Sequence, residues 1–144
     1  MKVERSVDIP APPEEIYAVV MDPRRLGDWV TIHEDLLEGP GGELSEGDEL
    51  TQQLKVAGQR FKVSWTVVKA DRPRDVEWEG RGPMGTNARV SYGLEDRGGS
   101  TCFNYVNEYE FPGGPLGKLG ARAFERKAAG EADKTLERLK GLFG

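Results

Sequence analysis

The chain has 144 residues, of which 37% are hydrophobic and 31% are charged, and its formal net charge is −5. This composition excludes a disordered or fibrous chain and fits one globular domain with a hydrophobic core. The negative charge and the lack of a basic run argue against nucleic acid as a partner, because phosphates are bound by clustered Lys and Arg.

The first predicted elements are a strand and two short helices. Val3, Val7 and Ile9 alternate with polar residues, apart from Arg5, as in a half-buried strand. Pro13 suits the first position of a helix. Asp22-Pro23 ends that helix, because a residue before proline avoids the α region, and Asp22 could cap a second short helix through Leu26. The apolar stripe of the first helix consists of Ile16, Val19 and Val20.

The middle of the chain predicts one strand after another. Glycine and proline turns separate the strands, and such short connections favour an antiparallel meander over crossovers. With the first strand, the sheet would have seven strands. The other six are predicted near 31–38, 47–57, 59–70, 74–81, 86–96 and 100–111.

Alternation gives the sheet one polar face and one apolar face. The polar face carries Gln53, Lys55, Lys62, Ser64, Glu77, Glu79, Arg89, Ser91, Asn104, Glu108 and Glu110. The apolar face collects Leu50, Gln52, Leu54, Val56, Phe61, Val63, Trp65, Val67, Val76, Trp78, Ala88, Val90, Tyr92, Leu94, Phe103, Tyr105, Asn107, Tyr109 and Phe111. We therefore expect water on one face and a cover on the other.

The predicted cover is a helix from about Leu116 to Leu142. At 1.5 Å per residue this helix would be roughly 40 Å long, enough to cross the sheet. No linker or repeat interrupts the chain, so residues 1–144 are predicted to form a single α+β domain. The apolar stripe of the helix consists of Ala121, Phe124, Ala128, Ala132, Thr135, Leu139 and Leu142.

The middle of this stripe is small, with Ala128 and Ala132 facing a bulky sheet surface. A twisted sheet is concave, so short side chains would leave a void that a ligand could occupy. Small residues also let a helix pack closely on a sheet. The pattern alone leaves both alternatives open.

Two segments resemble the START-related helix-grip superfamily (SRPBCC), in particular the polyketide cyclase/dehydrase and lipid transport-like family. The first segment runs from Val7 to Tyr17 and continues with Asp22-Pro23-Arg24-Arg25-Leu26 and Trp29. The second comprises Gly99-Ser100-Thr101, Tyr109-Glu110-Phe111, Gly113-Gly114-Pro115-Leu116-Gly117 and Leu136-Glu137-Arg138-Leu139. The resemblance implies a helix-grip fold, in which a curved seven-stranded sheet wraps around the C-terminal helix and encloses a hydrophobic cavity. Members of this superfamily bind lipids, polyketides, sterols or hormones, and a minority are enzymes.

The predicted ligand-binding residues lie on the inner face of the sheet, on the long helix and near the short helices. They are Trp29, His33, Gln52, Leu54, Phe61, Val63, Trp65, Trp78, Val90, Tyr92, Phe103, Tyr105, Asn107, Tyr109, Phe124, Ala128 and Ala132. Gln52 and Asn107 are polar at apolar positions, so they either pair with each other, a backbone group or buried water, or orient a ligand's polar end. Thr135 is also polar, although its hydroxyl can bond the carbonyl one turn back.

His33 is the single histidine and the candidate catalytic residue, because its ordinary pKa suits a proton shuttle. The alternative is a surface histidine in a loop. Neither a metal nor a cofactor is predicted, since the single histidine and Cys102 stand far apart without inward carboxylates.

The sequence favours a non-catalytic protein that binds or carries a hydrophobic or aromatic small molecule, similar to a lipid or a polyketide. The alternatives are a polyketide cyclase or aromatase-type enzyme using the same cavity, against which the lack of an inward carboxylate or arginine argues, and a chaperone-interacting module. A cytoplasmic monomer or homodimer is expected, without stable membrane insertion, because no apolar stretch approaches the roughly 20 residues of a membrane span.

Overall fold

The computed structural model of the chain describes residues 1–110 and 117–144, with side chains from residue 122 onward in the second range. Phe111, Leu116 and the side chain of Ala121 therefore lie outside the described residues.

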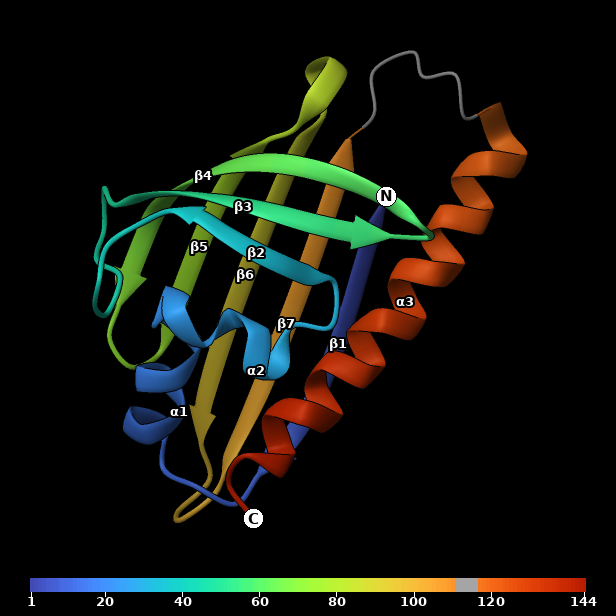
Figure 1. Cartoon of the computed structure of the whole chain (residues 1–144). Coiled ribbons are helices and arrows are strands. Elements are labelled where there is room, and N and C mark those ends of the chain that lie inside the picture. Colours follow the sequence, from blue (N-terminus) through green and yellow to red (C-terminus); the bar gives the residue numbers. More distant parts are fainter. Residues whose placement is uncertain (111–116) are drawn as a thin grey trace.

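Within these ranges, seven strands form one antiparallel sheet in the order β1-β7-β6-β5-β4-β3-β2, and a long helix runs along one side of it (Figure 1). The strands are β1 Lys2–Ile9, β2 His33–Glu38, β3 Glu49–Val56, β4 Gln59–Asp71, β5 Asp75–Arg81, β6 Asn87–Asp96 and β7 Thr101–Glu110. The helices are α1 Pro13–Val20, η1 Pro23–Arg25, α2 Leu26–Trp29, η2 Pro83–Gly85 and α3 Gly117–Gly141. This arrangement confirms the predicted α+β helix-grip fold.

The two short helical segments after β1 form as the proline positions predicted. Pro13 opens α1, and Pro23 follows Asp22, whose side chain accepts a hydrogen bond of 3.0 Å from the backbone N–H of Arg24. The second segment begins as a 3-10 turn and continues through α2 to Trp29, three residues beyond the predicted end. Its last residue, Trp29, is fully buried in the core.

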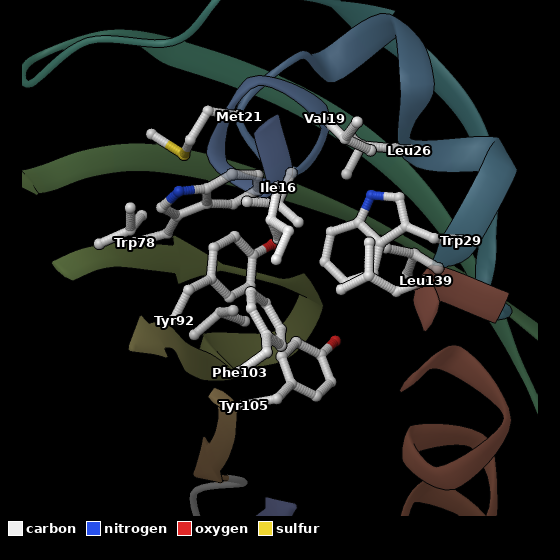
Figure 2. Packing of buried hydrophobic residues seen from close by; sticks show 14 of the residues in the cluster. Ile16, Val19, Met21, Leu26, Trp29, Trp78, Tyr92, Phe103, Tyr105 and Leu139 are labelled. Atoms are coloured by element: carbon white, nitrogen blue, oxygen red, sulfur yellow. The ribbon is translucent and has the colours of Figure 1, made fainter. Parts of the chain in front are cut away.

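The alternation of faces is confirmed strand by strand. Inward residues of β3 to β7 are buried, apart from the half-buried Phe61 and Tyr109, and the polar face is exposed or half-buried. At one end of the sheet, the rings of Tyr92, Phe103 and Tyr105 gather beside that of Trp29 (Figure 2). The ring centroids lie 5.6, 6.2 and 6.0 Å from that of Trp29. This end of the sheet is a filled aromatic core.

The two halves of α3 differ in how they are held. In its second half Ala132, Thr135, Leu136 and Leu139 are buried, whereas between residues 122 and 130 no side chain is fully buried. The prediction that Leu142 belongs to the apolar stripe is wrong, because the helix ends at Gly141 and Leu142 is 39% exposed. Leu136 takes its place in the core.

Hydrogen bonds and an ion pair fix the second half of α3. The backbone N–H of Thr31 donates to Thr135 Oγ1 over 3.1 Å, and the Thr31 hydroxyl donates to the Glu131 carbonyl over 3.2 Å. The carbonyl one turn before Thr135 is thus bonded by Thr31. Arg5 on β1 pairs with Asp133 at 2.8 Å.

The two edges of the sheet are β1 and β2. The α3 helix lies along β1, as Figure 1 shows. Strand β2 pairs with β3 irregularly, with register shifts between His33 and Asp35 and between Leu36 and Glu38.

Candidate functional site

Two small hollows lie between the inner face of the sheet and α3. The larger has a volume of about 40 Å³ and apolar walls from β3, β4, β6 and β7, the η2 turn and Phe124. The smaller, of about 10 Å³, lies deeper along α3 and is bordered by Tyr105, Asn107, Ala128 and Ala132. Four other residues border both hollows, namely Ile32, Val56, Tyr109 and Phe124. The two hollows therefore form one interrupted cleft.

The cleft is smaller than the cavity expected from the sequence. Volumes of about 40 and 10 Å³ hold a few water molecules at most, whereas typical ligand pockets measure about 300–1,000 Å³. Two packing features explain the difference. The aromatic core around Trp29 fills one end of the sheet, and at the other end the ring of Phe124 packs edge-on against Tyr109.

The predicted binding residues separate into two groups. Those that border the hollows are Leu54, Phe61, Val63, Trp65, Tyr105, Asn107, Tyr109, Phe124, Ala128 and Ala132. Those that do not are Trp29, His33, Gln52, Trp78, Val90, Tyr92 and Phe103. The second group lies mainly in the aromatic core or behind the wall of the cleft.

Sequence reasoning missed several lining residues. Ile32 precedes β2, and Pro83 and Thr86 belong to the turn between β5 and β6, so none of them follows the strand alternation. Val56 was on the predicted inner face but was not among the predicted binding residues. Its position at the end of β3, beside the turn to β4, was the signal that it borders the hollows.

A hydrogen-bonded series runs from the wall of the cleft to His33. Trp65 Nε1 donates to Gln52 Oε1 over 2.9 Å, and Gln52 Nε2 lies 2.8 Å from His33 Nδ1. Gln52 thus pairs with two side chains that the sequence did not suggest as its partners. Burial lowers the pKa of His33, although Asp35 opposes this effect. A neutral His33 can accept the hydrogen bond from the Gln52 amide at Nδ1.

Asn107 differs from Gln52, because one end of its amide is unused. Within the described residues, the buried side-chain atoms without a hydrogen-bond partner are Trp29 Nε1, Trp78 Nε1 and Asn107 Oδ1. Asn107 is the member of this group that borders a hollow. Burial of an unpaired polar atom destabilises a fold by about 1–3 kcal/mol, so this position calls for an explanation.

The tyrosines of the cleft and core are neutral near pH 7. Burial raises the pKa of Tyr92, Tyr105 and Tyr109 above the ordinary value for a phenol. For Tyr105, hydrogen bonding from Asn107 opposes this rise in pKa. Tyr105 and Tyr109, which border the hollows, can therefore offer hydroxyl groups to a bound molecule. As neutral phenols, the three side chains do not act as bases.

Two further features were sought in the described part of the chain, clustered metal ligands and membrane-spanning helices. It contains no group of three or more His, Cys, Asp or Glu side chains able to hold a metal ion, and none of its helices is long and apolar enough to cross a membrane. Its exposed large apolar side chains, Leu37, Met84 and Leu142, belong to three separate segments.

Comparison with known proteins gives a family match over the whole chain. Residues 1–144 match the family described as polyketide cyclase / dehydrase and lipid transport. The uncharacterized protein Rv1546 of Mycobacterium tuberculosis is 31% identical over 146 residues, which cover 99% of this chain and 98% of that protein. The toxin Rv0910 of the same organism is 25% identical over 124 residues, or 85% of this chain and 86% of the toxin.

Solved structures share the fold at low sequence identity. TTHA0849 from Thermus thermophilus superposes with a TM-score of 0.80 at 17% identity, covering 98% of this chain and 95% of the other. The Zhui aromatase/cyclase from Streptomyces sp. R1128 superposes with a TM-score of 0.78 at 16% identity, covering 98% of this chain and 92% of the other.

Proposed function

The chain belongs to the polyketide cyclase / dehydrase and lipid transport family, and on this basis we propose that it binds a small hydrophobic molecule between α3 and the inner face of the sheet. The observation that carries the proposal is the apolar cleft shared by the two hollows, whose larger part reaches the η2 turn and Phe124. Burial of a ligand's apolar surface there would drive binding.

Entry of a ligand would require the first half of α3 to move away from the sheet. A pocket for a molecule of ordinary ligand size needs several hundred Å³, far more than the hollows provide. The side chains of Arg122, Glu125, Arg126 and Lys127 are exposed, and Phe124 is half-buried. The second half of α3, held by Thr31 and Arg5, would stay in place. Phe124 would therefore leave Tyr109 as the ligand enters.

The direct test is native mass spectrometry of the purified full chain, in parallel with titration of a neutral fluorescent hydrophobic probe, N-phenyl-1-naphthylamine. We expect a co-purified small molecule or saturable binding of one probe per chain. If neither is found, and the chain is folded by circular dichroism, the proposed function is wrong.

A polyketide cyclase-type enzyme that uses the same cleft is a second candidate. The observation that favours it is the series from Trp65 through Gln52 to the neutral His33. An indole and an amide transfer protons poorly, and His33 does not border the hollows. A substrate would have to reach His33 directly, which makes binding without catalysis the better-supported function.

Incubation with a synthetic poly-β-ketone tests this second candidate. An enzyme would accelerate its cyclisation, followed by ultraviolet absorbance, and His33→Ala would remove the acceleration. Equal rates of cyclisation with and without the protein would contradict the enzyme candidate and leave ligand binding as the proposed function.

A further inference from the structure

We infer that Asn107 Oδ1 is the polar recognition point of the cleft, and that the ligand is a neutral, flat apolar molecule carrying an N–H or O–H donor. This inference rests on the proposed binding function and adds the chemical class of the ligand. It begins from the position of Asn107, which is 5% exposed on β7 and borders the smaller hollow with Ala128 and Ala132.

The sheet itself does not need an amide at this position. Asn107 is paired with Val3 on β1 and with Val90 on β6, and both neighbours are buried. A valine at position 107 would complete an apolar row of three across the strands, with no unpaired polar atom. The amide therefore serves something other than strand pairing.

The carbonyl oxygen of the Asn107 amide is the atom left without a partner. Asn107 Oδ1 is buried and has no hydrogen-bond partner, and the side chain borders the smaller hollow. An unpaired carbonyl oxygen in a hollow accepts a hydrogen bond from a ligand N–H or O–H group.

The second inward amide provides the contrast. Both ends of Gln52 are used, by Trp65 Nε1 and His33 Nδ1, and Gln52 borders neither hollow. The two other unpaired atoms, on Trp29 and Trp78, are also away from the hollows. Of these polar groups, Asn107 alone combines an unused atom with access to the cleft, within the described residues.

The charges around the cleft exclude a carboxylate ligand. No Lys or Arg is among the described residues that border the hollows, and the acidic residue there is Glu131. A buried carboxylate without a cation is strongly disfavoured, and Asn107 Oδ1 would repel it as well. The ligand class is therefore a neutral donor and not a fatty-acid anion.

Three small bicyclic probes of nearly equal shape test the inference. Indole carries an N–H donor, benzofuran has an oxygen acceptor in its place, and indene has neither. We expect indole to bind with a Kd about 2- to 10-fold lower than either of the others, as for one buried hydrogen bond. Chemical-shift titration of the ¹⁵N-labelled chain measures all three and identifies the Asn107 side-chain amide signal as one that moves.

Two variants assign the preference to Asn107. Asn107→Leu should bind all three probes equally, with the loss confined to indole, while Gln52→Leu should keep the preference for indole. Asn107→Val serves if the leucine variant does not fold, because valine flanks the position on both sides.

The outcomes separate this inference from the proposed function. Equal binding of the three probes to the wild-type chain, tightest binding of benzofuran, or an indole preference that survives Asn107→Leu would overturn the role of Asn107 and leave hydrophobic binding intact. A wild-type chain that binds none of the probes, nor the fluorescent probe above, would overturn both.

Discussion

The ring of Phe124 on α3 stands edge-on to the ring of Tyr109 on β7, with centroids 5.9 Å apart and planes at 86°. Both residues border both hollows. This pair therefore lies where the two hollows meet. Phe124 belongs to the half of α3 whose side chains are mostly exposed.

Phe124→Ala should strengthen ligand binding. An aromatic pair contributes about 0.5–1.5 kcal/mol beyond its buried area, and a ligand no longer has to displace it, so the Kd of the fluorescent probe should fall about 2- to 10-fold. Leu142→Ala removes an exposed side chain outside the cleft and should change nothing. Weaker binding by Phe124→Ala would mean that the ring is part of the binding surface.

Ala128→Phe should abolish probe binding while the fold persists. The new ring would occupy the smaller hollow, which Ala128 borders from the half of α3 that is proposed to move. Ala123→Phe, on the same helix but exposed, is the matched control and should bind normally. Titration and circular dichroism measure the two effects, and unimpaired binding by Ala128→Phe would place the ligand elsewhere.

Gln52→Leu should lower the free energy of unfolding by about 1–3 kcal/mol, because it leaves the buried Trp65 N–H without its acceptor. Gln59→Leu, at an exposed position on the next strand, should have an effect within about 0.5 kcal/mol. Urea unfolding followed by tryptophan fluorescence compares them. Equal effects would show that the bond to Trp65 contributes no stability.

The half-buried His33 should make the fold less stable in mild acid. Its pKa in the folded chain is lower than the ordinary value of about 6.5, so the unfolded chain takes up the proton first. The stabilising contribution is complete above pH 6.5 and is lost as the pH falls toward the folded-state pKa. His33→Asn should flatten the dependence of Tm on pH below about 6.5. A histidine proton resonance that titrates at or above 6.5 would contradict the prediction.

Gly80→Ala should be among the most damaging single methyl additions to the sheet. A Cβ at Gly80 would come 2.5 Å from Trp65 Cε3 and 2.9 Å from Val63 Cγ1, so the indole would have to shift and its bond to Gln52 would break. We expect a loss of about 2 kcal/mol or more.

Gly130→Ala is the counterpart of this change. It adds the same group to an open face of α3 and should stabilise the chain by up to about 1 kcal/mol. Thermal unfolding of the two variants provides the comparison, and equal Tm values would contradict it.

The strands and short helices followed from the sequence because their signals are local. Alternation placed Trp65, Tyr92 and Asn107 on the inner face correctly, and the prolines at 13 and 23 placed the helix starts. The size of the cleft could not be predicted in this way. It depends on Trp29 filling one end of the sheet and Phe124 covering the other. Trp29 contacts Tyr92, more than 60 positions away in the sequence, and Phe124 contacts Tyr109, about 15 positions away.

The chemistry of the site could be predicted only in part, because it also depends on contacts between residues that are distant in the sequence. The sequence marked Gln52 and Asn107 as unusual inward amides, but it could not distinguish the satisfied one from the unsatisfied one. That distinction depends on Trp65 lying directly beside Gln52 and on His33 reaching it from the edge strand β2.

The irregular pairing of β2 has a consequence for how copies of the chain meet. A straight exposed edge strand offers a row of backbone donors and acceptors to a neighbouring molecule. The register shifts at 33/35 and 36/38 interrupt that row, and Asp35 and Glu38 place negative charge along it. Two identical acidic edges repel each other, so the sheet resists growing into a continuous intermolecular sheet or an aggregate at this side.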